Sequence, residues 1–301
     1  MIDAAIQGLL LGGYYAILAA GLSLMFGVMR FINLAHGDLA VAGAYGVLFG
    51  VLTLGLPVWA AVLAMLPLMA ALGWLLQRWL FARALRAGFL LPLLVTFGLG
   101  AVLQNGLYGV FGSDTLSLGN HIGALSWASW TLPGGVVVGQ LPALTFLLAL
   151  AVLGGLQCLL SRTRLGRAIR ATATDAEAAQ LCGVDAGRVH RAAGAIAVSL
   201  AGLAGALLAM RALVNPYAGP AQLITAFEAV VIGGIGSLWG TLAGGIVLGV
   251  AQSLGALVTP QGFDLAGHAA FLLVLVARLA GARRFQLGKP ALRTYLKWRR
   301  A

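Results

Sequence analysis

Charged side chains are scarce in this sequence. They make up 9% of its 301 residues, whereas a soluble domain of this length carries about 25%. The few charges are also grouped, which leaves long neutral runs at 4–29, 39–77, 87–113, 192–210 and 229–263. A membrane-spanning helix needs about 20 apolar residues, so each run can hold one or two spans. The sequence therefore excludes an ordinary soluble domain and predicts an all-α, polytopic transmembrane helical bundle.

Other absences exclude further classes of protein. The runs do not alternate in polarity, as the strands of a membrane β-barrel do. The two cysteines, Cys158 and Cys182, give no disulfide framework. No Cys or His lies at ligand spacing from His36, so no metal site is predicted. A G-x-x-x-x-G-K-S/T phosphate loop is missing, so the sequence does not predict a P-loop ATPase, and we predict no enzymatic activity.

Basic residues outnumber acidic ones, 19 to 8, for a net charge of +11. They lie between the apolar runs, at Arg30, at 78–86, at 162–191 and from 278 to 300. Cytoplasmic loops of membrane proteins carry this excess of Lys and Arg. We therefore interpret the basic groups as marking the cytoplasmic side of the membrane, and we expect no nucleic-acid partner. The prediction is a multi-pass protein of the bacterial inner membrane, surrounded by lipid, with a periplasmic N-terminus and a cytoplasmic C-terminus.

This orientation gives about nine membrane segments, with eight to ten allowed. The last apolar stretch, 222–257, must split into two short helices at Gly236-Ser237-Leu238-Trp239-Gly240, because a single crossing would carry the basic tail outside. All segments belong to one domain, 1–301, with a basic cytoplasmic tail at 283–301. The predicted segments are 4–28, 36–55, 57–77, 89–111, 141–161, 192–212, the two halves of 222–257, and 265–282.

The loop at 162–191 is far richer in charge than its surroundings. Its run Ala176–Leu181 has helix-forming composition, and Gly183 is placed to end a helix there. A short helix that projects from a bundle suits docking into a partner's groove. An ordinary solvated loop that carries the topological charge explains the composition equally well, so both interpretations stay open at this point.

Several motifs are spread across residues 21–249. They are Gly21-Leu22-Ser23-Leu24-Met25-Phe26-Gly27, Ile32-Asn33-Leu34-Ala35-His36-Gly37-Asp38, Gly43-Ala44-Tyr45, Thr96-Phe97-Gly98-Leu99, Gln104-Asn105, parts of 166–184, and Val231-Ile232-Gly233-Gly234-Ile235-Gly236-Ser237 with the glycines that follow. These motifs, and the order in which they occur, resemble the LivH-type branched-chain amino acid permeases of ATP-binding-cassette (ABC) transporters.

The resemblance implies a division of labour. A permease of this family works with a second, related permease, two cytoplasmic ABC ATPase subunits and a periplasmic solute-binding protein. The chain would hold no cofactor, since ATP and magnesium belong to the ATPases. Loop 162–191 would be the coupling element that contacts an ATPase, through Gly166, Arg167, Arg170, Asp175, Leu181 and Gly183.

The transport path needs weak polar partners, because the solute must also leave them. The candidates in otherwise apolar helices are Asn33, His36, Thr96, Gln104, Asn105 and Glu228. Hydrogen bonds that hold helices together are an alternative role for each. Glu228 and Arg211 both stand alone in apolar surroundings, and we predict that they pair as an outer gate.

A secondary transporter or channel for a small polar solute is the alternative to an ABC permease, because broken helices occur in those proteins too. The sequence offers no chain of intramembrane acids for proton or sodium coupling, which favours the ABC permease. The solute itself stays open among branched-chain amino acids and related small polar compounds.

Overall fold

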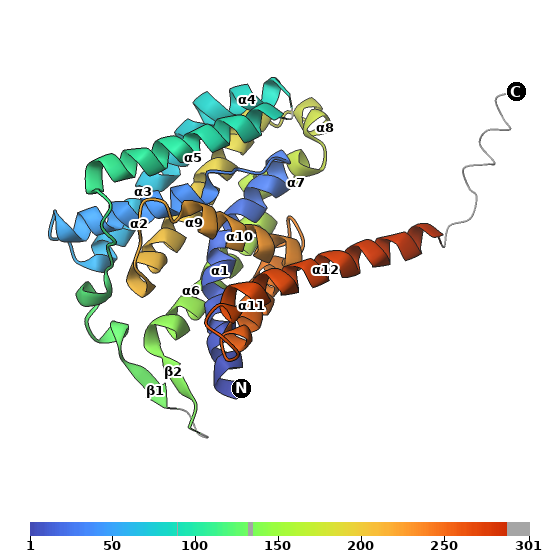
Figure 1. Cartoon of the computed structure of the whole chain (residues 1–301). Helices are drawn as coiled ribbons and strands as arrows, with labels where there is room; N and C mark the ends of the chain where they lie inside the picture. Colours follow the sequence, from blue (N-terminus) through green and yellow to red (C-terminus); the bar gives the residue numbers. More distant parts are fainter. Residues whose placement is uncertain (89, 132–134, 288–301) are drawn as a thin grey trace, which may run out of the picture.

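The computed structural model describes residues 1–88, 90–131 and 135–287 as a bundle of apolar helices with one small hairpin (Figure 1). The helices are α1 (Ile2–Met29), α2 (His36–Leu52), α3 (Val58–Leu76), a π-helical turn (Gln77–Phe81), α4 (Ala82–Arg86), α5 (Leu90–Phe111), α6 (Gln140–Arg162), α7 (Arg164–Thr174), α8 (Ala176–Leu181), α9 (Ala186–Arg211), α10 (Gly219–Gly233), α11 (Leu238–Gly255) and α12 (Gly262–Leu287).

The membrane segments match the prediction in number. Within the described residues, seven helices are long and apolar enough to cross a membrane, and two more apolar helices, α2 and α10, are shorter. The predicted break at 236–240 is confirmed, because α10 ends at Gly233 and α11 starts at Leu238, with Gly234 and Gly236 at positive φ between them.

Helix α1 lies at the centre of the bundle, packed against α6, α9, α10 and α11. In its most apolar window, 83% of the residues are buried, and α9 follows with 72%. Close packing of α1 on α11 depends on small residues: a Cβ on Gly8 or Gly12 would lie 2.5 Å from the backbone of Val250 or Ile246. Such contacts replace the hydrophobic driving force that is absent between helices in lipid.

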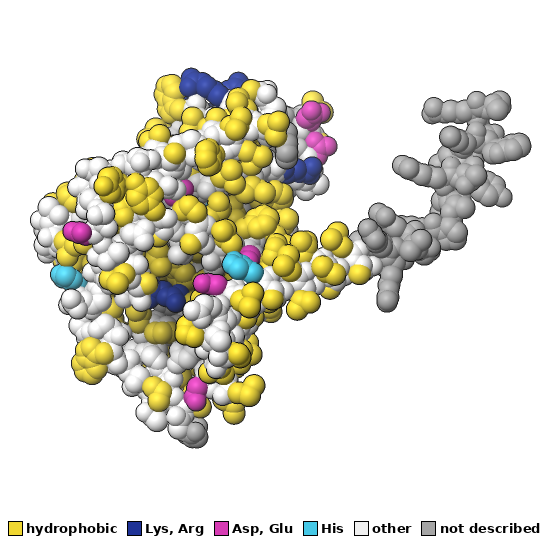
Figure 2. Space-filling view, viewed as in Figure 1, with side chains coloured by type: hydrophobic (Ala, Val, Ile, Leu, Met, Phe, Trp, Pro, Cys, Tyr) yellow, Lys and Arg dark blue, Asp and Glu magenta, His cyan; other side chains and the backbone are white. Residues whose placement is uncertain are grey.

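The bundle has two chemically different ends (Figure 1). The hairpin end holds the N-terminus and the strands β1 (Ser129–Thr131) and β2 (Val137–Gly139), which pair antiparallel with Trp130 opposite Val138. The hairpin is an addition to the predicted all-helical fold. The charged end holds α4, α7 and α8. In Figure 2, apolar side chains are spread over the whole visible face, and basic and acidic ones gather over α4 and α8.

Several predicted boundaries are wrong at the charged end. The stretch 162–191 is almost wholly helical, because Thr163 and Asp185 act as side-chain N-caps that start α7 and α9. Helix α3 continues past 77 through the π-helical turn into α4. Of the predicted basic tail, 283–287 form the end of α12, and 288–301 lie outside the described residues.

Candidate functional site

The segment between α1 and α2 folds back into the bundle. Arg30 ends α1 with φ 55°, the left-handed conformation that reverses the chain. The chain then runs back along α1, and Nε2 of His36 lies 2.8 Å from the Leu18 carbonyl oxygen, roughly halfway along that helix. Helix α2 therefore starts inside the bundle and not at its edge, which accounts for its shortness.

Helix α10 starts at the same place. A Cβ on Gly37 would collide with the carbonyl of Gly219, the first residue of α10. The N-termini of α2 and α10 thus meet in the middle of the bundle. Their N-cap residues are Ala35 and Ala218, and alanine has no side chain that can cap a helix.

Asp38 fills the junction between these two helix ends. Its side chain is 4% exposed, and Oδ1 accepts a 2.8 Å hydrogen bond from Nε2 of Gln104 on α5. The carboxylate also lies directly against Gly219 and Gly100. A negative charge is favourable beside the partial positive charge of helix N-termini. We did not single out Asp38 from the sequence, although a carboxylate within an apolar membrane segment is a signal of function.

Three predicted path residues bind this junction together. The Oδ1 atom of Asn33 accepts from the Ala35 N–H (3.1 Å), and Oγ1 of Thr96 accepts from the Leu34 N–H (3.2 Å). With the His36 contact, these bonds attach the returning segment to α1 and α5. Gln104 joins the same cluster through Asp38. Four of the six predicted residues are therefore neighbours, and each makes a contact that a structural role alone would explain.

Asn105 lies apart from them, on the exposed face of α5. Its amide donates to the Ala101 carbonyl of the same helix (2.8 Å). Three glycines of this helix also have free space beside them, since no described atom lies within 4 Å of a Cβ placed on Gly98, Gly106 or Gly109. Only 17% of the most apolar window of α5 is buried.

The predicted pair of Arg211 and Glu228 is wrong. Glu228, 4% exposed, instead lies 2.5 Å from Nδ1 of His268, which joins α10 to α12. Arg211 stacks over the ring of Tyr14, 4.7 Å from its centre. The prediction failed because α10 starts at the central junction, which places Glu228 deeper in the bundle and facing another helix.

The six predicted coupling residues lie on α7 and α8 and in the turns that follow these helices, at the charged end. Gly166 packs on the backbone of α6, and its N–H donates to the Thr163 cap (3.0 Å). Asp175 caps α8 by accepting from two backbone N–H groups at 3.0 Å. Gly183, at φ 83°, ends α8 as predicted, and Leu181 beside it is 91% exposed. Arg167 and Arg170 are exposed.

Arg30 connects this unit to the centre of the bundle. Its guanidinium donates to the carbonyl oxygens of Ala173 and Thr174, each at 3.3 Å, at the C-terminus of α7. A cation is favourable beside the partial negative charge of a helix C-terminus. Sequence reasoning used Arg30 only as a topological charge and missed this contact.

Comparisons with known proteins identify the family of the chain. The family model described as "Branched-chain amino acid transport system / permease component" matches residues 4–279. The branched-chain amino acid permease protein BraD of Pseudomonas aeruginosa is 33% identical over 301 residues, 95% of each chain. LivH of Salmonella typhimurium is 29% identical over 294 residues, 94% of each chain.

A shorter similarity links the chain to the fructose import permease protein FrcC of Rhizobium meliloti, which is 39% identical over 98 residues, 30% of this chain and 27% of that one. No solved structure matches the chain. The full-length matches confirm the family that the motifs indicate, and the chain belongs to the permease components of branched-chain amino acid transport systems.

Proposed function

We propose that this permease is the membrane-spanning subunit of an ATP-driven importer for branched-chain amino acids or closely related small solutes. The observation that carries the proposal is the similarity to BraD and LivH along almost the whole chain. Relatives with this extent of similarity are named as parts of high-affinity branched-chain amino acid transport systems. The chain itself is non-catalytic, and ATP and magnesium bind in partner subunits.

Two cytoplasmic ATPases dock on the α7–α8 unit of this permease and of its partner permease. The unit is suited to this role because both of its helices are capped, it projects at the charged end, and it exposes Leu181. An exposed leucine can enter an apolar groove of a partner, while the exposed Arg167 and Arg170 of α7 fix the orientation of the unit. Movement of the unit reaches α1 through the hydrogen bonds of Arg30.

A second, related permease covers the open face of α5. An amide such as that of Asn105 is unfavourable in lipid unless it faces protein or water, and open glycines permit close helix contact. The solute path then lies along this face, with Gln104 and Asn105 on it. Asn33, His36 and Thr96 shape the path by fixing the central junction.

The charged end faces the cytoplasm of a bacterial cell, and the hairpin end faces the periplasm, where a solute-binding protein delivers the solute. The basic groups at 78–86 and 162–191 support this orientation through the positive-inside rule. The short match to a fructose permease is a reason to test sugars beside amino acids.

A secondary transporter is the second candidate, because the short helices α2 and α10 meet inside the bundle, and the buried Glu228 of α10 is hydrogen-bonded to His268 of α12. The two functions differ in their energy source. Uptake into vesicles that follows ATP, and survives collapse of the ion gradients, supports the importer. Uptake that follows a gradient without ATP supports the secondary transporter.

The direct experiment is gentle solubilisation of native membranes, capture of the tagged chain and identification of its partners. We expect two ATPase subunits and a second permease. Leu181→Asp should release the ATPases and abolish ATP-driven leucine uptake. Leu213→Asp is the matched control, because Leu213 is also exposed (68%) but lies next to the hairpin-end terminus of α9. Retention of the ATPases by Leu181→Asp would contradict this docking site.

A further inference from the structure

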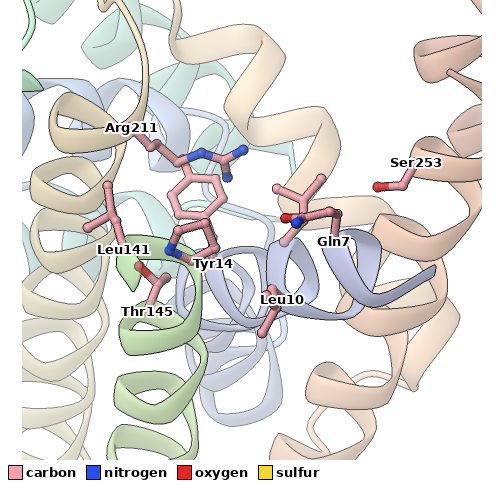
Figure 3. Close-up of a pocket in the computed structure, with 9 residues that line it drawn as sticks. Gln7, Leu10, Tyr14, Leu141, Thr145, Arg211 and Ser253 are labelled. Carbon is pink, nitrogen blue, oxygen red and sulfur yellow. The ribbon is translucent and has the colours of Figure 1, made fainter. Parts of the chain in front are cut away.

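A cavity opens at the hairpin end of the bundle, with Tyr14 in its wall (Figure 3). It measures about 190 Å³ and lies between α1, α6, the end of α9 and α11. Its walls combine apolar side chains with a few polar ones. The lining residues are Gln7, Leu10, Leu11, Tyr14, Leu141, Pro142, Thr145, Arg211 and Ser253.

Arg211 supplies the positive charge of this cavity. Its guanidinium lies over the Tyr14 ring and points toward the space beside Gln7 and Ser253 (Figure 3). Tyr14 is 2% exposed, and its hydroxyl donates to Oε1 of Gln222 (2.6 Å), so the stacking platform is fixed. Among the described residues, the ion pairs are Asp185 with Arg188 and Glu228 with His268, so Arg211 has no carboxylate partner there.

The remaining walls define what could bind beside the guanidinium. The hydroxyls of Thr145 and Ser253 and the amide of Gln7 provide polar groups, and Gln7 is held by its bond to the Val137 carbonyl on β2 (2.8 Å). Leucines and a proline line the rest. A guanidinium matches a carboxylate through two parallel hydrogen bonds, and the apolar walls match a short aliphatic chain.

The size of the cavity limits the ligand. A volume of about 190 Å³ is several times the roughly 30 Å³ that one water molecule occupies in the liquid. It is also smaller than the roughly 300–1,000 Å³ of sites for drug-sized molecules. A solute with one carboxylate and a few carbon atoms fits this range.

We propose that this cavity is a vestibule that binds the carboxylate of a small aliphatic solute through Arg211 before the solute passes into the bundle. The inference rests on the proposed function and adds to it a site and a required chemical group. Because Arg211 is exposed, water competes for the carboxylate, and the solute is held without being trapped.

The test is equilibrium binding of tritiated L-leucine to the purified full-length permease in phosphatidylcholine nanodiscs, without a solute-binding protein. The competitors are 4-methylpentanoate, which keeps the carboxylate and lacks the amine, and L-leucinamide, which lacks the carboxylate. We expect 4-methylpentanoate to compete and leucinamide to be weaker by about tenfold or more, the usual effect of losing a charged hydrogen bond. Equal competition by the two compounds would overturn the proposal without any variant.

Arg211→Gln should weaken leucine binding by about tenfold or more, and Arg211→Lys should restore part of it. Arg83→Gln is the matched control, because Arg83 is also an arginine stacked on an aromatic ring, that of Trp79, but lies at the charged end. Unchanged leucine binding by Arg211→Gln would contradict the proposal.

A phospholipid headgroup offers a similar anionic group, and native mass spectrometry of co-purified lipid separates the two sources. Loss of bound phospholipid in Arg211→Gln, with leucine binding intact, would identify the headgroup as the ligand and overturn the proposal. ATP-driven leucine uptake by the wild-type complex is measured in parallel. If that uptake is present while Arg211→Gln binds leucine as the wild type does, the vestibule proposal is wrong and the importer proposal is still supported. If it is absent, the proposed function fails on its own.

Discussion

Helices α1 and α5 have similar compositions and opposite surroundings. Both are long, apolar and rich in glycine, yet 83% of the most apolar window of α1 is buried, against 17% for α5. A Cβ on Gly12 of α1 would lie 2.5 Å from the Cα of Ile246, whereas one on Gly106 of α5 would meet no described atom within 4 Å. A glycine in a membrane helix can therefore mark a contact already made within the chain or a face left open for another chain.

The same substitution in each helix tests this difference most strongly. Gly12→Leu forces α1 and α11 apart along their whole contact, and overpacking of this kind destabilises by about 1–3 kcal/mol or more. We expect little folded protein, measured as the monodisperse fraction after size-exclusion chromatography in mild detergent. A wild-type elution profile for Gly12→Leu would mean that the α1–α11 contact is looser than the structure has it.

Gly106→Leu should leave the chain's own stability within about 0.5 kcal/mol, as expected for a surface change. It should instead weaken association with the second permease, measured by the amount that co-purifies with the tagged chain. If association is unchanged while Gly12→Leu still unfolds the chain, α5 faces lipid and the partner must bind elsewhere.

Arg30→Gly tests whether the buried α1 carries movement from the charged end. Glycine adopts a positive φ readily, so the substitution removes the guanidinium and keeps the turn. We expect ATP hydrolysis by the assembled complex to continue while leucine taken up per ATP falls several-fold. Arg86→Gln is the control, since the hydrogen bond that Arg86 makes within the described part of the chain is to Ala82 of its own helix. A normal ratio of uptake to hydrolysis in Arg30→Gly would remove Arg30 from the coupling route.

Asp185 should give the smallest effect. The Arg188 N–H donates to its carboxylate (3.0 Å), and this bond holds the pKa of Asp185 below its ordinary value. The stabilisation is complete above the ordinary pKa and is lost as the pH falls through the lower pKa of the folded protein. Exchange of the Arg188 amide hydrogen should therefore accelerate below about pH 4. Asp185→Asn keeps a capping side chain and should remove this pH dependence; a pH-dependent rate in that variant would assign the effect to another group.

Hydropathy and glycine spacing were enough to predict the number of segments and the break at 236–240, because both depend on local composition. Asp175 and Gly183 likewise define α8 from its two ends. Helix α7 was missed, because its arginines were interpreted as loop charges, although Thr163 provides a cap. Local chemistry is readable from a sequence where a cap or a helix-ending glycine is recognised.

Contacts between side chains of different helices could not be predicted from the sequence. Arg211 and Glu228 were placed at similar depth, but hydropathy gives no information about the direction in which a residue faces around the bundle. It also cannot show that residues 30–35 return into the interior. The first residue of α2, His36, was predicted, but its depth in the bundle, and with it the role of Asp38, required the three-dimensional structure.

The central junction also has a consequence for the order in which the chain is made. Asp38 lies between two helix ends, but Gly219 and the rest of α10 are synthesised only after α9. Gln104 is 66 residues downstream of Asp38 and its hydrogen-bond donor, so it becomes available much earlier. During membrane insertion, the Gln104 amide can therefore donate a hydrogen bond to the Asp38 carboxylate before α10 is synthesised. Helix α5 then stabilises the buried acid of α2 while the second half of the chain is still being made.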